Sequence, residues 1–156
     1  MSSIGKKLPK FSLKNQDDKV ITQTDLEGSY SVLYFYPKDD TPGCTKEACG
    51  FTENIKAFEK LGVKVYGVSP DDVASHKKFA TKYKLKIELL ADTEQKLCNA
   101  LDVIGEKNMY GKIYRGVIRT TFIINPDGEI AEVYNNVRVD GHVDKVKEKI
   151  TELIKL

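Results

Sequence analysis

The feature that most constrains the fold is an abrupt change of pattern within residues 31–49. The run from Ser31 to Tyr36 is β-branched and aromatic, which is typical of a buried strand. Pro37 ends this run because proline cannot donate to a sheet ladder. Pro42 and Gly43 interrupt the chain again, and apolar residues then recur every three or four positions. The stretch therefore predicts a strand, a short loop and an amphipathic helix in direct succession.

The predicted helix begins near Cys44 and ends at Gly62. Its apolar stripe comprises Ala48, Phe51, Ile55, Phe58 and Leu61. Cys44 therefore lies in or beside the first turn, where unpaired amide N–H groups and the helix macrodipole favour negative charge. Because a thiolate is such a charge, Cys44 is a candidate nucleophile.

Cys49 follows Cys44 by five residues in the same predicted helix. Five helical residues place two Cα atoms roughly 8 to 9 Å apart, whereas a disulfide needs less than about 7 Å. A Cys44–Cys49 disulfide would therefore require the first helical turn to unwind, which couples its formation to local unfolding. A reduced molecule is expected to have an intact first turn.

Length and charge limit the classes of protein that the chain can represent. Its 156 residues fit a single domain, residues 1–156, that can bury a core without disulfides. Lys and Arg number 25 against 23 Asp and Glu, with no basic block, so nucleic acid is not an expected partner. Residues 1–10 lack the apolar core of a signal peptide, and no apolar run is long enough to span a bilayer. A cytoplasmic protein without membrane contact is expected.

The three cysteines are an odd number, which argues against a secreted disulfide framework. No Cys-x-x-Cys pair is present, and His76 and His142 lack metal-like spacing, so no metal site is predicted. Both histidines have polar neighbours on predicted helices and are expected at the surface. Cys98 lies on an apolar helix face and is expected to be a structural thiol. No Gly-rich loop follows a strand, so no nucleotide or flavin cofactor is predicted.

The remaining pattern predicts an alternating α/β chain. Strands are expected over residues 11–13, 20–21, 63–68, 87–91, 120–124 and 129–134, the first and last pairs as hairpins. Helical segments are expected over residues 24–27, 69–83, 92–101 and 143–154. Ser69 is the expected N-cap of the second of these, and the Gly-rich residues 102–118 are expected to form loops. This order is compatible with a thioredoxin-like sheet and with other α/β folds.

Pro37, Thr41 and Cys44 occupy the Pro-x-x-x-Thr-x-x-Cys pattern of peroxiredoxins. With Cys49 five residues later, the chain resembles the bacterioferritin comigratory protein, or peroxiredoxin Q, subfamily. Similar segments follow in the same order at residues 69–79, 110–116, 119–122 and 127–130. The resemblance covers essentially the whole chain and selects a thioredoxin-like fold, in which a central mixed β-sheet is flanked by helices and preceded by a small hairpin.

This resemblance implies a cofactor-free thiol peroxidase that reduces hydrogen peroxide and organic hydroperoxides. It implies that Cys44 is the peroxidatic cysteine, that Thr41 supplies a hydroxyl hydrogen bond, and that Arg119 stabilises charge on the thiolate and in the transition state. Pro37 is expected to shape the loop and shield the thiolate. Cys49 is the implied resolving thiol, and a thioredoxin-like protein the implied reductant. The subfamily favours a monomer, although a homodimer stays open.

Other interpretations of single residues remain open at this level. The amide of Gly43 could donate to the peroxide oxygens. Glu47 could form an ion pair with Arg119, but a surface glutamate favoured by the helix dipole is the simpler account, so it is left out of the catalytic set. Cys98 keeps a second resolving route open.

A different class of function is also compatible with the residues. Oxidation of Cys44 could unwind the helix and expose Phe51, as in a redox-responsive chaperone or binding protein. A thioredoxin-type dithiol oxidoreductase is disfavoured because the two cysteines are not spaced as Cys-x-x-Cys.

Overall fold

The strand that Pro37 ends lies inside the sheet. In the computed structural model, which describes residues 3–155, this strand is β3 (Ser31–Phe35), and all five of its residues are buried. It pairs in parallel with β4 (Lys64–Ser69) and antiparallel with β8 (Thr120–Ile124). A strand that is paired on both sides and covered on both faces has no solvent side, which explains why its sequence is continuously apolar.

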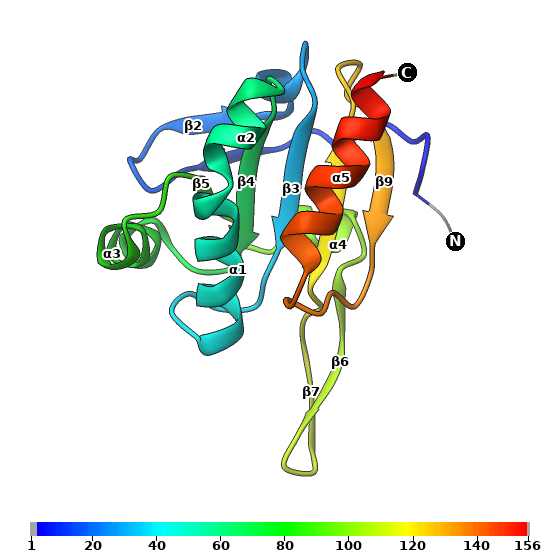
Figure 1. Cartoon of the computed structure of the whole chain (residues 1–156). Helices are drawn as coiled ribbons and strands as arrows, with labels where there is room; N and C mark the ends of the chain where they lie inside the picture. Colours follow the sequence, from blue (N-terminus) through cyan, green and yellow to red (C-terminus); the bar gives the residue numbers. More distant parts are fainter. Residues whose placement is uncertain (1–2, 156) are drawn as a thin grey trace.

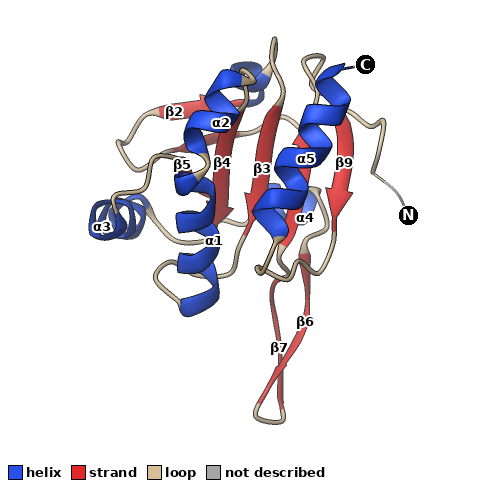
Figure 2. Ribbon diagram, in the orientation of Figure 1, coloured by secondary structure: helices blue, strands red, loops and turns tan. Residues whose placement is uncertain are grey.

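The other strands extend the sheet on both sides of β3 (Figure 2). Beside β4 lie β5 (Glu88–Ala91) and then the N-terminal hairpin of β1 (Ser12–Lys14) and β2 (Val20–Thr22). Beyond β8 lies β9 (Ile130–Tyr134), which is antiparallel to it. Within the described residues the order is β2-β1-β5-β4-β3-β8-β9. Both predicted hairpins and the predicted mixed sheet are confirmed.

Helices cover both faces of the sheet (Figure 1). One face carries α1 (Pro42–Glu53), α2 (Ile55–Lys60), α3 (Val73–Tyr83) and α5 (His142–Lys155). The other face carries the 3-10 helix η1 (Gln23–Leu26) and α4 (Lys96–Ala100). The side chains of β3 alternate between these two cores, since Val32 and Tyr34 pack in the first and Leu33 and Phe35 in the second.

The helix predicted to continue to Gly62 is two helices. Asn54 separates α1 from α2 with φ −99° and ψ 6°, outside the helical region. Its side-chain amide donates to the Gly50 carbonyl at 2.9 Å, a local bond that competes with helix propagation. The prediction of one helix was wrong here, although Phe51 and Phe58 still share one fully buried stripe.

Three predicted helix starts were also wrong, one of them that of the helix expected from residue 92, which begins only at Lys96. Ser69 is the last residue of β4, and α3 is capped by Asp72, whose carboxylate accepts from the Ser75 amide at 2.8 Å. The capping box near residue 24 uses Thr22 and Asp25 instead. The caps expected at residues 69 and 24 are thus displaced along the chain, to Asp72 three positions later and to Thr22 two positions earlier.

The prediction of loops over residues 102–118 was wrong. This segment forms a hairpin of β6 (Ile104–Met109) and β7 (Lys112–Val117) that stands away from the sheet as an arm (Figure 1). Tyr110 and Gly111 connect the strands with φ of 52° and 82°, as a two-residue type I′ turn requires. Because the arm is largely exposed, its sequence lacks the apolar alternation that marks a half-buried strand. The arm and the start of α1 lie at the same end of the molecule.

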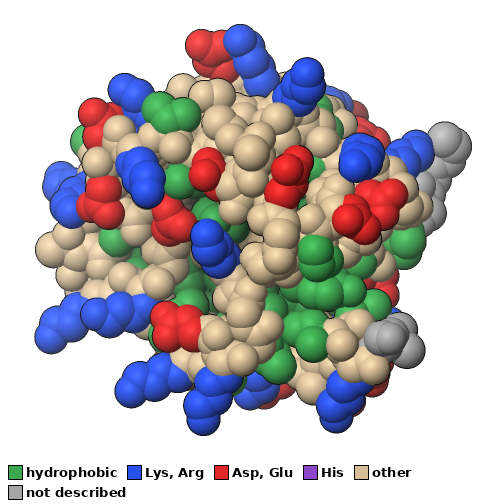
Figure 3. Space-filling view, turned by 90° about the horizontal axis from the view of Figure 1, so that it is seen from above, with side chains coloured by type: hydrophobic (Ala, Val, Ile, Leu, Met, Phe, Trp, Pro, Cys, Tyr) green, Lys and Arg blue, Asp and Glu red, His purple; other side chains and the backbone are tan. Residues whose placement is uncertain are grey.

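The opposite end of the molecule is seen in Figure 3, where Lys and Arg side chains are interspersed with Asp and Glu around a hydrophobic area. Across residues 3–155, no helix combines the length and the apolar character needed to cross a membrane.

Gly67 of β4 makes room for Tyr34 on the neighbouring strand. A Cβ at residue 67 would lie 2.8 Å from the Tyr34 ring and 3.1 Å from Leu89, and Tyr34 is fully buried. Gly67→Ala should therefore overpack the core and lower the free energy of unfolding by about 1–3 kcal/mol, measured by urea denaturation. An unchanged urea midpoint would show that the ring can move aside without cost.

Candidate active site

The candidate site forms where β3 ends and the chain turns into α1. Thr41 is the N-cap of α1 and Pro42 its first residue, so Cys44 is the third residue of the helix, as predicted. The first amide N–H groups of a helix lack intrahelical partners, and the macrodipole favours negative charge beside them. Cys44 is only 1% exposed, so these dipoles act on the sulfur with little screening by solvent.

Arg119 provides the direct contact to the sulfur. Its Nη2 donates to Cys44 Sγ at 3.0 Å, and its side chain is 19% exposed. Arg119 immediately precedes β8, and the β3–β8 register places Thr120 opposite Phe35, at the end of β3. A guanidinium held here stabilises a thiolate and can also stabilise negative charge that develops on a reacting oxygen.

Gly43 is needed for this contact. A Cβ at residue 43 would lie 2.8 Å from Arg119 Nη2. The sequence suggested that Gly43 opens the backbone to substrate, and the structure adds a steric reason, because any side chain would collide with the guanidinium.

Glu47 was expected at the surface, and that expectation was wrong. Its side chain is 1% exposed, and Oε1 accepts from Arg119 Nη1 at 3.0 Å. Burial raises the pKa of Glu47 to about 7, and the guanidinium of Arg119 opposes that rise. The carboxylate therefore fixes one side of the guanidinium while the other side faces Cys44. Helical spacing contained the signal, since position 47 lies three residues after Cys44 and directly before Ala48 on the buried stripe.

The second carboxylate oxygen of Glu47 does not take part in the contact with Arg119. Among the described residues, its Oε2 is buried without a hydrogen-bond partner, as is the hydroxyl of Tyr34. Burial raises the pKa of Tyr34, and the nearby charges of Glu47 and Cys44 raise it further, so this phenol stays neutral beside the site.

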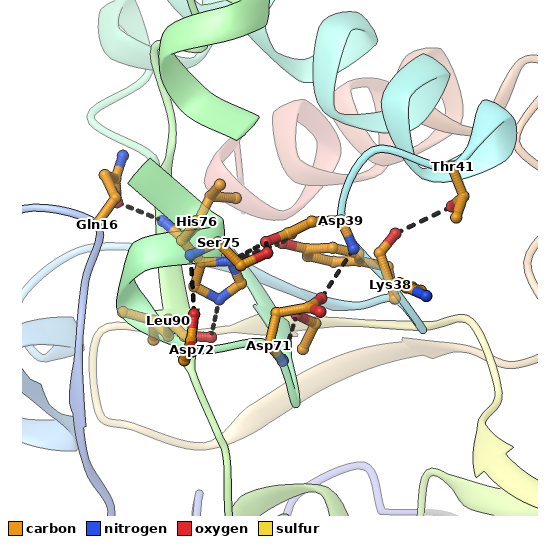
Figure 4. Close-up of polar contacts among 12 residues, drawn as sticks. Gln16, Lys38, Asp39, Thr41, Asp71, Asp72, Ser75, His76 and Leu90 are labelled. Carbon is orange, nitrogen blue, oxygen red and sulfur yellow. Dashed lines mark hydrogen bonds and ion pairs between the residues drawn. The ribbon is translucent and has the colours of Figure 1, made fainter. Parts of the chain in front are cut away.

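Thr41 and Pro37 shape the loop. Thr41 Oγ1 donates to the Lys38 carbonyl at 3.0 Å (Figure 4), so in this structure the hydroxyl of Thr41 is engaged within the loop. The Tyr36 amide still donates to Val68 of β4 at 3.0 Å, and the strand pairing stops at the half-buried Pro37, as predicted.

Cys49 lies on α1, half-buried, in a groove of about 320 Å³ between α1 and the start of α5. Burial raises the pKa of Cys49, and the charge of Glu53 raises it further, so in this conformation the side chain is a thiol. Cys44 and Cys49 are both free and the first turn of α1 is intact. The expectation for a reduced molecule is therefore confirmed.

Cys98 is fully buried on α4, as expected for a structural thiol. It packs in the core on the other face of the sheet from Cys44. Burial raises the pKa of Cys98 well above its usual range, and Asp92 adds to the rise. The sheet thus separates Cys98 from Cys44, which argues against the second resolving route.

The histidines were also expected at the surface, and both are buried. His142 Nε2 lies within hydrogen-bond distance of Thr121 Oγ1, at 2.8 Å, and burial lowers the pKa of His142 to about 4, so the ring is neutral at pH 7. His76 is fully buried against Asp39 (Figure 4). Their partners are 21 and 37 residues away, respectively, which a local polar pattern cannot reveal.

Lys107, in the middle of β6, is a second cation near the site that the sequence did not identify. Its Nζ donates to the Val117 carbonyl at 2.9 Å. Burial lowers the pKa of Lys107, and Arg119 lowers it further, whereas the charge of Cys44 opposes both. No group of three or more His, Cys, Asp or Glu within residues 3–155 is placed to hold a metal ion.

Comparisons of the chain with family models, curated proteins and solved structures agree with one another. The AhpC/TSA family model matches residues 4–133. A protein from Coxiella burnetii named putative peroxiredoxin bcp is 46% identical over 143 residues, covering 92% of this chain and 95% of the relative. The structure of a Xanthomonas campestris bacterioferritin comigratory protein, described for its alkyl peroxide reduction activity, has a TM-score of 0.88 and 39% identity, covering 92% of each chain. The structure of a Xylella fastidiosa PrxQ mutant has a TM-score of 0.91 and 37% identity, covering 97% of each chain.

Glu47 makes the stability depend on pH in a direction that can be measured. Its pKa in the fold is about 7, above its ordinary value of 4.5. The folded state therefore holds this proton between those pH values while the unfolded state releases it, so the stability that Glu47 contributes is present at low pH and lost as pH rises to about 7. Glu47→Gln has no titratable group at this position. The free energy of unfolding of Glu47→Gln, relative to that of the unaltered protein, should therefore rise by about 3 kcal/mol between pH 4 and pH 8.

Urea denaturation across this pH range measures the difference. Glu53→Gln is the matched control, because Glu53 lies on the same helix but is exposed. A pH-independent difference for Glu47→Gln would mean that Arg119 keeps Glu47 fully ionised throughout.

Proposed function

The chain belongs to the AhpC/TSA family as a peroxiredoxin, a thiol-dependent peroxidase, and we propose that it uses Cys44 as the peroxidatic and Cys49 as the resolving cysteine. The observation that carries the proposal is the 3.0 Å contact from Arg119 to Cys44 Sγ at the N-terminus of α1. This arrangement favours the thiolate through a full positive charge and through the helix dipole together.

In the first step the Cys44 thiolate attacks one oxygen of a hydroperoxide. The S–O bond forms as the O–O bond breaks, so sulfur is oxidised to a sulfenic acid. The other peroxide oxygen leaves and, after gaining a proton, becomes part of water or an alcohol. Arg119 stabilises the charge on the leaving oxygen. Turning of the Thr41 hydroxyl from the Lys38 carbonyl toward the bound peroxide would supply one more hydrogen bond, and Pro37 keeps the loop closed around the sulfur.

In the second step the Cys49 sulfur attacks the Cys44 sulfenic acid. The S–S bond forms and the sulfenic oxygen leaves as water, which balances the step without another reactant. Both cysteines lie on α1 five residues apart, so their Cα atoms are roughly 8 to 9 Å apart in an intact helix. The first turn must therefore unwind before the bond can form.

A dithiol protein such as thioredoxin then reduces the disulfide by thiol–disulfide exchange. The groove beside Cys49 supports this step, because it opens that sulfur to a partner while Cys44 stays buried. Organic hydroperoxides are proposed as substrates beside hydrogen peroxide, by likeness to the alkyl peroxide reduction of the Xanthomonas protein. We further propose that the chain acts as one domain, in the cytoplasm, and as a monomer.

The redox-responsive chaperone is less well supported. Phe51 is fully buried and stacks on Tyr34, with ring centroids 4.8 Å apart. Since Phe51 lies two helical turns beyond Cys44, its exposure would require unwinding far past the turn that the disulfide needs to open.

The test is to add one equivalent of hydrogen peroxide to the reduced protein, follow free thiols by rapid quenching, and map the product by peptide mass spectrometry. Rapid loss of two thiols, with Cys44 linked to Cys49 and Cys98 free, is the expected result. A link from Cys44 to Cys98 would reassign the resolving residue. Slow or absent oxidation of Cys44 would overturn the proposal.

Cysteine variants separate the two steps. Cys44→Ser should abolish peroxide consumption, because the nucleophile is lost. Cys49→Ser should react once with peroxide and accumulate a sulfenic acid but lose recycling by thioredoxin, whereas Cys98→Ser should turn over normally. Steady-state thioredoxin oxidation measures all three, and normal turnover by Cys49→Ser would remove that residue from the mechanism.

Arg119 can be tested by its charge and by its shape. Arg119→Gln should lower the second-order rate constant for Cys44 oxidation on the order of 100-fold, because the donor to the sulfur and to the leaving oxygen is lost. Arg119→Lys keeps the charge but cannot contact Glu47 and Cys44 at once, so a smaller loss is expected. Arg115→Gln on the exposed arm is the control. Equal rates for Arg119→Gln and this control would contradict the role of Arg119.

A further inference from the structure

A buried carboxylate holds the active-site loop to α3. Asp39 lies between β3 and α1 and is 8% exposed. Its Oδ1 accepts from the Tyr36 hydroxyl at 2.6 Å. Its Oδ2 accepts from Ser75 Oγ at 2.8 Å and lies 2.7 Å from His76 Nδ1 (Figure 4). The hydroxyls of Tyr36 and Ser75 thus donate to the carboxylate and a ring nitrogen of His76 faces it, so two of these three partners belong to α3.

The other nitrogen of His76 also faces an acceptor. Nε2 lies 2.9 Å from the Leu90 carbonyl on β5, and the imidazole is 0% exposed. A carbonyl oxygen only accepts, and so does the carboxylate of Asp39. With Asp39 as a carboxylate, both contacts are hydrogen bonds at once only if both ring nitrogens carry hydrogen, that is, if His76 is an imidazolium. With a neutral ring and a carboxylate, a nitrogen lone pair would face an oxygen lone pair at a fully buried position.

The backbone of Asp39 is held from the same side. Its amide donates to Asp71 Oδ2 at 2.8 Å, and the Ser69 hydroxyl donates to the same oxygen at 2.7 Å. The following residue, Asp40, pairs with Lys82 of α3 at 2.8 Å, but both of these side chains are exposed. The buried contacts at Asp39 are therefore the ones that solvent and salt do not weaken.

We propose that the Asp39–His76 ion pair anchors the active-site loop to α3 and thereby positions Thr41 and the N-terminus of α1 around Cys44. Neither side chain of the pair contacts the sulfur. Asp39 and His76 are positioning residues, which act through the loop that joins them to the helix start. The kinetic part of this inference rests on the proposed function, whereas its structural part does not.

The anchor also sets where unwinding begins. Cys44 lies five positions after Asp39, and an extended chain of that length spans up to about 17 Å. The ion pair can therefore persist while Cys44 moves the few ångströms needed to reach Cys49. Unwinding is then confined to the chain from Pro42 onward, and the anchor serves the peroxide step without opposing the disulfide step.

Three variants isolate the pair. Asp39→Ala removes all contacts of the carboxylate. Asp39→Asn keeps its shape and can still accept from Tyr36, but the introduced amide must donate to His76, which leaves the ring neutral. Asp40→Asn is the matched control on the neighbouring residue, and asparagine tolerates the positive φ of 57° at that position. Thermal unfolding of each variant establishes that it is folded before it is compared.

The structural test uses the reduced proteins without peroxide. ¹⁵N spectra of labelled histidine should show hydrogen on both nitrogens of His76 in the unaltered protein and on one nitrogen in Asp39→Asn. Amide hydrogen exchange at residue 39 and at Thr45, whose N–H groups donate to Asp71 and to the Thr41 carbonyl, should be about tenfold to a hundredfold faster in Asp39→Ala and intermediate in Asp39→Asn. Exchange in α5 should not change. A neutral His76 in the unaltered protein, or equal exchange in Asp39→Ala and Asp40→Asn, would overturn the proposal.

The kinetic test separates the two chemical steps by rapid quenching and thiol labelling. Asp39→Ala should slow Cys44 oxidation by peroxide on the order of tenfold, because the loop no longer holds the site. The conversion of sulfenic acid to disulfide should be no slower than in the unaltered protein. A loss confined to the disulfide step would overturn the positioning role. Absence of Cys44 oxidation in the unaltered protein would instead overturn the proposed function, and the exchange data would still decide the anchor.

Discussion

The contact between Arg119 and Cys44 is the interaction on which the rest of the site depends. A thiolate buried to 1% exposure is costly unless a cation or oriented dipoles compensate for the lost water. Arg119 and the N-terminus of α1 supply both. Glu47 holds the second arm of the guanidinium, and Gly43 leaves the space for it. The sulfur of Cys44, the cation of Arg119 and the carboxylate of Glu47 therefore form one electrostatic unit, and the glycine at position 43 is required sterically.

The sheet brings this unit together. Parallel pairing of β3 with β4 and antiparallel pairing with β8 place the end of β3 beside the start of β8, so that α1 and Arg119 meet. On the other flank, α3 holds the loop through Asp39 and His76. The site thus lies between the end of the central strand and α3, and in the proposed cycle only the first turn of α1 has to move. This division fits an enzyme whose proposed cycle combines a precise attack with local unwinding.

Prediction from the sequence succeeded for features that depend on local patterns and failed for those that leave no local pattern. The central strand, both sheet hairpins and the start of α1 were predicted correctly, since each depends on local steric preference and hydrophobic periodicity. The arm over residues 104–117 was missed because an exposed hairpin has no apolar alternation. Glu47 and His76 were placed at the surface because a polar side chain is normally solvated, and a buried one is recognised only through its partner.

The sequence by itself determined the chemistry: a strand stopped by proline, a cysteine in the first turn of a helix, and a second cysteine five residues later, beyond disulfide reach in an intact helix. These features follow from interactions between residues close in the chain. Arg119 was expected from the family resemblance, whereas only the tertiary structure decided how its guanidinium meets the sulfur, which carboxylate holds it, and that Cys98 lies across the sheet. Arg119 is 75 residues from Cys44 and 72 from Glu47. Contacts over such separations arise from strand register and packing, which no local pattern encodes.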